Sequence, residues 1–214
     1  LLESRGLGDV YKRQTYEKYR YTNGALLTSE YNDLDFHLGY AYFEKATPYT
    51  NVKSYNVIKQ KNDLDKSIQY FRNYIHQSDF SDSSRYHSAL VRIADAYFVL
   101  KNDSLAIENY KKSLDIEGFN HSYALYQLST SQGLIQDYDG KMETLQKLTD
   151  EYPKSRYQVL SLLNLAQTYK DLDKNVEAIN TYLKFIDEYP NNNFISTAFV
   201  CLLYTSDAAD DQLG

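Results

Sequence analysis

Small, aromatic and apolar residues recur at helical spacing in this sequence, and their recurrence constrains the fold more than any other feature. The clearest unit runs from Leu162 to Pro190, "LLNLAQTYKDLDKNVEAINTYLKFIDEYP". One face of a first helix is formed, at i, i+3, i+4 and i+7, by Leu162, Leu165, Ala166 and Tyr169. After the polar turn "KDLDKN", one face of a second helix is formed by Ala178, Tyr182 and Phe185. Pro190 ends that helix, so the segment predicts a pair of helices joined by a short turn.

Earlier segments fit the same frame. A unit at about residues 84–118 matches at Leu90, Ile93, Ala94, Tyr97, Ala106, Tyr110 and Ser113, with Gly118 in the place of the proline. The next unit, at about 121–153, matches at Leu125, Leu128, Ser129, Leu145, Leu148 and Pro153. In this middle unit Gln132 replaces the aromatic residue and Lys141 replaces the small alanine. We therefore expect its helix pair to pack more loosely than the others.

The N-terminal part holds a longer version of the unit, at about residues 31–80. It contains "LGYAYF", with Leu38, Gly39 and Tyr42 in register, followed later by Ser67 and Phe71. An insertion at about 46–61 separates its two helices. We expect residues 191–200 to form the start of a further helix after the last complete unit, which spans about 157–190.

This spacing resembles the tetratricopeptide repeat (TPR), whose pattern is W-x₂-L-G-x₂-Y, then A-x₃-F, then P. In the clearest unit Leu162 takes the Trp place and Ala166 the Gly place. Small residues let the two helices approach closely, and the aromatic residues fill the space beside them. The resemblance implies an all-α fold, a right-handed superhelical solenoid of antiparallel helix pairs in which neighbouring pairs bury each other's apolar faces.

The resemblance also implies a concave groove built from the first helix of each unit. Its positions are Ser88, Val91, Arg92, Asp95 and Phe98 in one unit, Tyr123, Tyr126, Gln127 and Thr130 in the next, and Leu163, Asn164, Gln167 and Lys170 in the last. We expect a protein or peptide partner to be bound by Arg92, Asp95, Tyr123, Tyr126, Gln127, Asn164 and Gln167. Some TPR proteins clamp a C-terminal carboxylate at such places. Because Val91, Asp95, Tyr126 and Thr130 replace that clamp, we do not expect this chain to bind chaperone tails. The other reading of these residues is that they solvate a structural spacer.

The segments "EYPKSRY" and "EYPNNNF" are similar to helix ends in envelope TPR proteins of Gram-negative bacteria. Those proteins include the lipoprotein of the outer-membrane barrel-assembly machine and the periplasmic coordinator of the Tol–Pal system. The resemblance implies a protein-interaction scaffold in the periplasm or at the periplasmic face of the outer membrane, with a possible lipid anchor in a missing N-terminal part. The alternative is a cytoplasmic TPR regulator, or the sensor portion of a larger signalling protein.

Composition and motifs argue against several other functions. The net charge is −6 and the basic residues form no stripe, so nucleic acid is not an expected partner. No apolar run is long enough to span a bilayer. The histidines are scattered, and no nucleotide-binding or metal-binding motif occurs. We therefore expect no enzymatic activity and no cofactor.

The two ends of the chain match neither the repeats nor the rest of the composition. "DVYKRQ" can be written as the codons GAT GTG TAT AAG AGA CAG, and the reverse complement of that DNA, read one base later, translates to "CLLYTS", which begins at Cys201. Both flanks are therefore similar to one transposon-end sequence of the kind used in sequencing adapters. We expect residues 1–14 and 201–214 to be translated adapter DNA, and residues 15–200 to be a fragment of a TPR solenoid.

Overall fold

The computed structural model describes residues 28–47, 57–78 and 82–211. Within these residues all regular secondary structure is α-helical, which confirms the predicted all-α fold. The described residues fall into two compact units, one ending at Phe119 and the other beginning at Asn120. The N-terminal flank, 1–14, lies outside the described residues.

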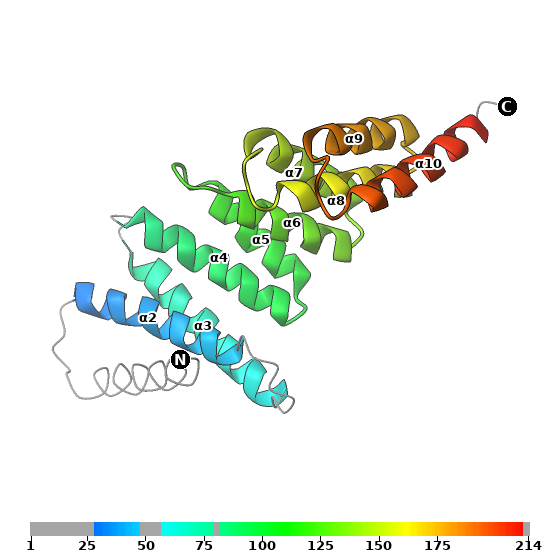
Figure 1. The fold of residues 1–214 in the computed structure, drawn as a ribbon. Coiled ribbons are helices and arrows are strands. Elements are labelled where there is room, and N and C mark those ends of the chain that lie inside the picture. The colour runs from blue at the N-terminus through cyan, green and yellow to red at the C-terminus, as the bar shows by residue number, and fades with distance from the viewer. Residues whose placement is uncertain (1–27, 48–56, 79–81, 212–214) are drawn as a thin grey trace. The chain divides into compact units, whose positions relative to one another are not determined.

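Four described helices make up the first unit. They are α2 (Thr28–Ala46), α3 (Val57–Gln77), α4 (Ser83–Val99) and α5 (Asp103–Leu114). Helix α2 packs against α3, and α4 packs against α5, so each forms a hairpin of two helices (Figure 1). Helix α3 also packs against α4, which joins the two hairpins. Because α3 begins at Val57, the last residues of the predicted insertion are helical.

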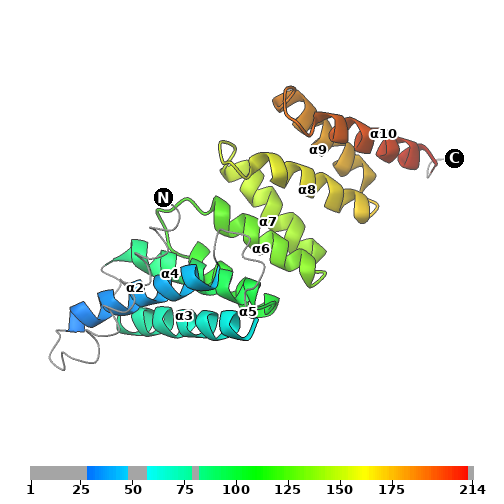
Figure 2. The same ribbon diagram turned by 60° about the horizontal axis from the view of Figure 1, so that its bottom comes forward.

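Five described helices make up the second unit. They are α6 (Ser122–Leu134), α7 (Tyr138–Glu151), α8 (Gln158–Asp171), α9 (Asn175–Glu188) and α10 (Ile195–Asp211). Figure 2 shows the pairs α6–α7 and α8–α9 following one another, with α10 at the end of the series. From α6 to α10, each helix packs against the next one along the chain.

The turn between the helices of a pair has the same backbone in three successive pairs. In each turn one residue other than glycine takes the left-handed conformation, with φ of 58° at Lys101, 63° at Gln136 and 56° at Asp173. The backbone N–H of the following residue donates to a carbonyl in the last turn of the helix, at 2.9 Å in all three cases. This geometry ends an α-helix and reverses the chain. The repeat is therefore visible in the backbone even where the side chains of the middle pair depart from the pattern.

The predicted small residues lie where two helices approach closely. Ala106 and Ala178 are completely buried, as the sequence predicted. At Gly39 the approach is closer still, since a Cβ atom there would lie 2.7 Å from the ring of Phe71 on the paired helix. That distance is a clash, so Gly39 permits the α2–α3 contact.

Polar side chains fill the middle pair in place of the usual aromatic and alanine. The Oγ1 atom of Thr144 donates to the Oε1 atom of buried Gln132 at 2.8 Å, which joins α7 to α6. The side chain of Lys141 extends past Gly133, where an added Cβ would lie 3.3 Å from its Cδ atom. Burial lowers the pKa of Lys141, although the charge of Asp171 acts in the opposite direction. At these positions the α6–α7 contact thus includes a hydrogen bond and a half-buried cation.

Substitutions at these equivalent positions test the repeat register. Replacing Ala106 or Ala178 with leucine should lower the free energy of unfolding by about 1–3 kcal/mol, because the added carbons overpack a closed contact. Replacing Lys141 with leucine should be neutral or should raise it by up to about 1 kcal/mol, because an apolar group replaces a half-buried cation. Urea denaturation of the three variants measures these changes. Equal losses at all three positions would show that Lys141 does not occupy the alanine place.

The last helix includes the described part of the predicted C-terminal flank. Ala198 is completely buried in a cluster with Leu162, Ala178 and Phe185, and Leu202 packs against that cluster. Helix α10 therefore covers the apolar face of the α8–α9 pair with residues from both sides of position 200. That residues 201–214 derive from adapter DNA remains a prediction.

Candidate functional site

On α4, the predicted groove residues Arg92 and Asp95 bind each other. An Nη1 atom of Arg92 lies 2.6 Å from the Oδ2 atom of Asp95 in an ion pair across one helical turn. The other oxygen of that carboxylate, Oδ1, accepts a hydrogen bond of 2.6 Å from the hydroxyl of Tyr110 on α5. Asp95 is buried, and both of its oxygens have partners within the first unit. Its carboxylate therefore joins α4 to α5.

The guanidinium of Arg92 also contacts the neighbouring hairpin. It lies 5.6 Å from the ring centre of Tyr40 and 5.4 Å from that of Phe43, both on α2. These are cation–π distances. Burial lowers the pKa of Arg92, but the charge of Asp95 and the interactions with Tyr40 outweigh burial and hold that pKa above its ordinary value. Arg92 is therefore a charged link between α2 and α4.

Tyr40 and Phe43 belong to the same set of positions, although they were not predicted as site residues. Counted from the small residue of each first helix, Tyr40 and Phe43 follow Gly39 as Asp95 and Phe98 follow Ala94. Extending the register of α4 to α2 would have identified both aromatic residues. The first unit thus presents aromatic side chains at these places, and Arg92 is held against two of them, Tyr40 and Phe43.

On α6, the predicted residues form an aromatic cluster. The ring of Tyr126 stacks on that of Tyr157 at 5.2 Å between centres, and Tyr123 approaches Tyr157 at 5.8 Å. The amide nitrogen of Gln127 donates to the hydroxyl of Tyr123 at 3.2 Å. The three tyrosines and Gln127 are half-buried, so each retains surface that a partner can contact. We call Tyr123, Tyr126, Gln127 and Tyr157 the tyrosine cluster.

Tyr157 was not predicted as a site residue because it precedes α8, the first helix of its repeat. It occupies the N-cap position of α8 without a capping hydrogen bond from its side chain. Arg156 places its guanidinium 4.8 Å from the centre of the Tyr157 ring and donates to the Tyr157 hydroxyl. The signal in the sequence was an aromatic residue four positions after each helix-ending proline, which is Tyr157 after Pro153 and Phe194 after Pro190. The two turns also share their backbone hydrogen bonds, so the aromatic residue is part of the repeated turn.

On α8, the predicted residues Asn164 and Gln167 are half-buried. The amide nitrogen of Gln167 donates to Asp171 at 2.6 Å, and its amide oxygen accepts from the hydroxyl of Tyr182 at 3.3 Å. Burial raises the pKa of Tyr182, and so does its interaction with Cys201. Gln167 thus joins α8 to α9. The backbone carbonyl of Asn164 accepts a hydrogen bond from the hydroxyl of Thr168 at 2.6 Å.

The candidate residues on α4, α6 and α8 make polar and aromatic contacts. Among the residues that the structure describes, no group of three or more His, Cys, Asp or Glu side chains is placed to hold a metal ion. None of the helices in the described ranges is long and apolar enough to cross a membrane. The residues of α4 belong to the first unit and those of α6 and α8 to the second, so they are two separate groups here.

Comparison with known families identifies the repeat in three places. Residues 87–120 match one sequence profile described as tetratricopeptide repeat, and residues 123–155 and 160–192 match a second profile of the same description. These ranges correspond to the pairs α4–α5, α6–α7 and α8–α9. Among curated proteins, none has a sequence that matches this chain significantly.

Solved structures with a similar fold include three proteins of low sequence identity. The match to MamA covers 81% of this chain and 83% of the MamA chain, with 17% identity and a TM-score of 0.58. The apo form of RapI covers 92% of this chain, which spans only 55% of RapI, with 15% identity and a TM-score of 0.65. YrrB is described as a TPR protein with an unusual peptide-binding site. The match to it covers 79% of this chain and 77% of the YrrB chain, with 14% identity and a TM-score of 0.55. At these identities the similarity concerns the fold.

Proposed function

Because this chain is a tetratricopeptide repeat protein, and such repeats act as scaffolds for protein–protein interaction, we propose that its tyrosine cluster binds an extended or helical segment of a partner protein. The observation that carries this proposal is the half-buried group of aromatic rings on α6 and at the start of α8. The scaffold role requires binding and no chemical step. YrrB, which has a similar fold and a peptide-binding site, supports the same reading.

The composition of the tyrosine cluster suits protein recognition. Tyrosine combines a large apolar ring with a hydroxyl that can exchange hydrogen bonds, and it is enriched among the residues that dominate binding energy. The rings of Tyr126 and Tyr157 already stack on each other, so a partner finds a surface whose side chains have lost part of their freedom. Arg156 adds a cation beside that surface.

The remaining predicted residues extend the proposed site less strongly. Arg92 and Asp95 are engaged with Tyr40, Phe43 and Tyr110, so any partner contact there would compete with contacts that hold the first unit together. Gln167 is engaged with α9 in the same way. We therefore place the centre of the proposed site at Tyr126 and retain Asn164 and Gln167 of the same unit as secondary contacts. Arg92 and Asp95 stay a separate candidate group in the first unit.

Replacing Tyr126 with alanine tests the proposed site. We expect this substitution to weaken the binding free energy for a true partner by about 2 kcal/mol, because it removes the ring that stacks on Tyr157 and the contact area that the ring offers. The measurement is a pull-down from the source organism's extract, followed by titration of the captured partner against the purified variants. Circular dichroism should show unchanged helix content, since Tyr126 is only half-buried.

Tyr138 provides the matched control. It is an exposed tyrosine on α7 of the same unit and lies outside the tyrosine cluster. Replacing Tyr138 with alanine should leave partner capture unchanged. If the wild type, Tyr126→Ala and Tyr138→Ala proteins capture the same partners equally, the tyrosine cluster is not a binding site and the spacer reading takes its place.

We also propose that the protein acts in the periplasm or at the periplasmic face of the outer membrane. The support is the similarity of "EYPKSRY" and "EYPNNNF" to the helix ends of envelope TPR proteins, and both segments form the same turn here. A cytoplasmic TPR regulator is the alternative. Fractionating cells that carry a tagged full-length gene distinguishes the two, and recovery in the cytoplasm alone would contradict the envelope location.

A further inference from the structure

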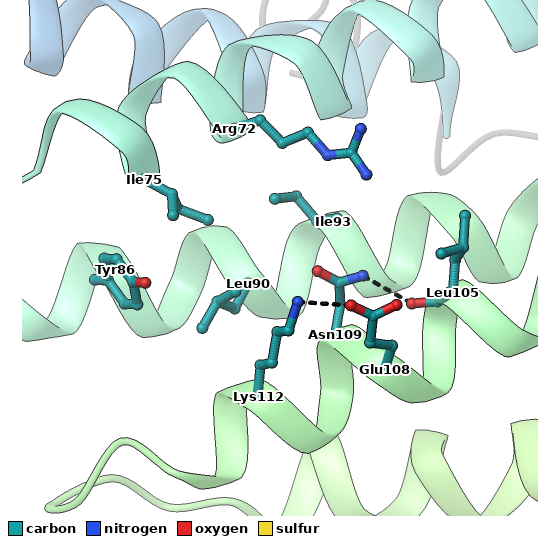
Figure 3. Close-up of a pocket in the computed structure, with 9 residues that line it drawn as sticks. All are labelled: Arg72, Ile75, Tyr86, Leu90, Ile93, Leu105, Glu108, Asn109 and Lys112. Carbon is teal, nitrogen blue, oxygen red and sulfur yellow. Dashed lines mark hydrogen bonds and ion pairs between the residues drawn. The ribbon is translucent and has the colours of Figure 1, made fainter.

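The first unit contains a cavity that the proposed function does not use. It has a volume of about 290 Å³ and lies between α3, α4 and α5 (Figure 3). The tyrosine cluster belongs to the other unit, and the α4 groove residues Arg92 and Asp95 do not line this cavity. Its walls come from two second helices, α3 and α5, and from the opposite side of α4.

The floor of the cavity is aliphatic. Leu90 and Ile93 of α4 are buried, while Ile75 of α3 and Leu105 of α5 are half-buried. All four side chains line the same space. Ile75 and Leu105 still reach solvent, and an apolar group from outside that covers them would remove their apolar surface from water.

The rim of the cavity carries two cations and one anion. Arg72 of α3 donates through Nη2 to the hydroxyl of Tyr97 at 2.7 Å, and its guanidinium lies 5.7 Å from the centre of that ring. This bond uses one of the five N–H donors of a guanidinium, so the group is held in place with donors to spare. On α5, Lys112 donates to Glu108 at 2.6 Å.

The Glu108–Lys112 pair is exposed and can exchange partners. About half of each side chain is in contact with solvent, 55% for Lys112 and 52% for Glu108. An exposed ion pair across one helical turn contributes little to stability. The pKa of Glu108 is lowered by its hydrogen bond with Lys112 and by the charges of Lys112 and Arg72. The Glu108 carboxyl is therefore ionised at neutral pH. The rim therefore has a net positive charge and a lysine that can turn to a second carboxylate.

Asn109 adds a directed polar group to the wall. Its amide nitrogen donates to the backbone carbonyl of Leu105 at 2.8 Å, which fixes the plane of the amide. Figure 3 shows its amide oxygen on the side away from Leu105. An amide oxygen in that position can accept a hydrogen bond from the backbone N–H of a bound segment.

We propose that this cavity binds a partner polypeptide by one aliphatic side chain and a neighbouring Asp or Glu carboxylate, the side chain entering between Leu90, Ile93 and Leu105 and the carboxylate pairing with Arg72 and Lys112. The volume favours a single anchoring side chain, because pockets for small molecules occupy about 300–1,000 Å³ and this cavity lies at or below the bottom of that range. The charge of the rim selects an acidic segment over a basic one.

The test uses a random dodecapeptide library displayed on phage and selected on the purified full chain. We expect the enriched peptides to share an aliphatic residue next to Asp or Glu. Synthetic fluorescent copies of these peptides are then titrated against variants by fluorescence anisotropy. Lys112→Glu and Arg72→Gln should each weaken binding by about tenfold or more, because each removes a charge-assisted contact to the carboxylate.

Adjacent lysines on α5 provide a matched control. Lys111 is exposed like Lys112 but does not line the cavity, so Lys111→Glu has the same charge change and should leave the affinity within about twofold of the wild type. Circular dichroism melts establish that all variants fold. The Tyr126→Ala variant should retain the same peptides, which separates this site from the tyrosine cluster.

Three results would overturn the proposal. The first is a selection that yields no peptides with an acidic residue beside an aliphatic one. The second is that the enriched peptides bind Lys112→Glu and Lys111→Glu equally well. Finally, loss of binding in Tyr126→Ala with full binding in Lys112→Glu would assign the peptides to the tyrosine cluster and leave the cavity without a ligand.

Discussion

Replacing Phe185 with alanine is expected to lower the free energy of unfolding of the second unit by about 3–5 kcal/mol. The side chain of Phe185 is completely buried and lies in one cluster with Leu162, Tyr182 and Ala198, so it joins α8, α9 and α10. Its ring also stacks on Tyr189 at 5.7 Å. Truncation would leave a cavity bounded by three helices, and a rigid surround collapses poorly into such a space. Urea denaturation followed by circular dichroism measures the change.

Leu183 is the control for this prediction. It lies on the same helix with 48% of its surface exposed, so Leu183→Ala removes apolar atoms without opening a cavity. Its cost should stay within about 0.5 kcal/mol, as for surface substitutions in general. A loss at Leu183 as large as the loss at Phe185 would mean that the two faces of α9 have been exchanged.

The buried face of α9 could be predicted from the sequence because it depends on spacing alone. Ala178, Tyr182 and Phe185 recur at helical intervals, and a helix that places them on one stripe must bury that stripe. The same argument identified Ala106 and Tyr110 on α5, and both are completely buried. Local spacing thus fixed which side chains form the core.

The environment of the candidate site depends on contacts between helices, and spacing does not specify them. An ion pair between Arg92 and Asp95 can be predicted from their spacing, because residues three apart on a helix are neighbours. The contacts of Arg92 with Tyr40 and Phe43 require α2 to lie beside α4, and the bond from Tyr110 requires α5 to turn its core face toward Asp95. A residue assigned to a partner surface by its position can therefore be engaged within its own unit.

The middle pair shows a second limit of sequence reasoning. Gln132 and Lys141 were departures from the pattern, and their compensations lie elsewhere on the same helices. Thr144 supplies a hydroxyl to Gln132, and Gly133 leaves space for the stem of Lys141. A pattern compared one position at a time registers the two departures and misses the two compensations. The turn at Gln136, which matches those at Lys101 and Asp173, preserves the geometry of the pair.

Replacing Asp95 with alanine should reveal whether this carboxylate serves the fold or a partner. We expect a loss of about 3 kcal/mol in the free energy of unfolding, because breaking a buried ion pair leaves its partner groups without compensation. Arg92 would lose its ion pair and Tyr110 the acceptor of its buried hydroxyl. About a third of the Arg92 side chain is exposed, so water can compensate that charge in part and the loss should fall at the low end of the range for buried pairs.

Two further variants separate the contributions to that loss. Asp95→Asn keeps an oxygen that can accept from Tyr110 but removes the charge, so its cost should be about half that of alanine. Tyr110→Phe removes only the hydroxyl that donates to Asp95 and should cost about 1–2 kcal/mol. Denaturation curves rank the three variants, and partner capture is measured on each below its unfolding transition. If Asp95→Ala unfolds like the wild type but no longer captures the partner, the carboxylate belongs to the binding surface, and its bonds to Arg92 and Tyr110 are secondary to recognition.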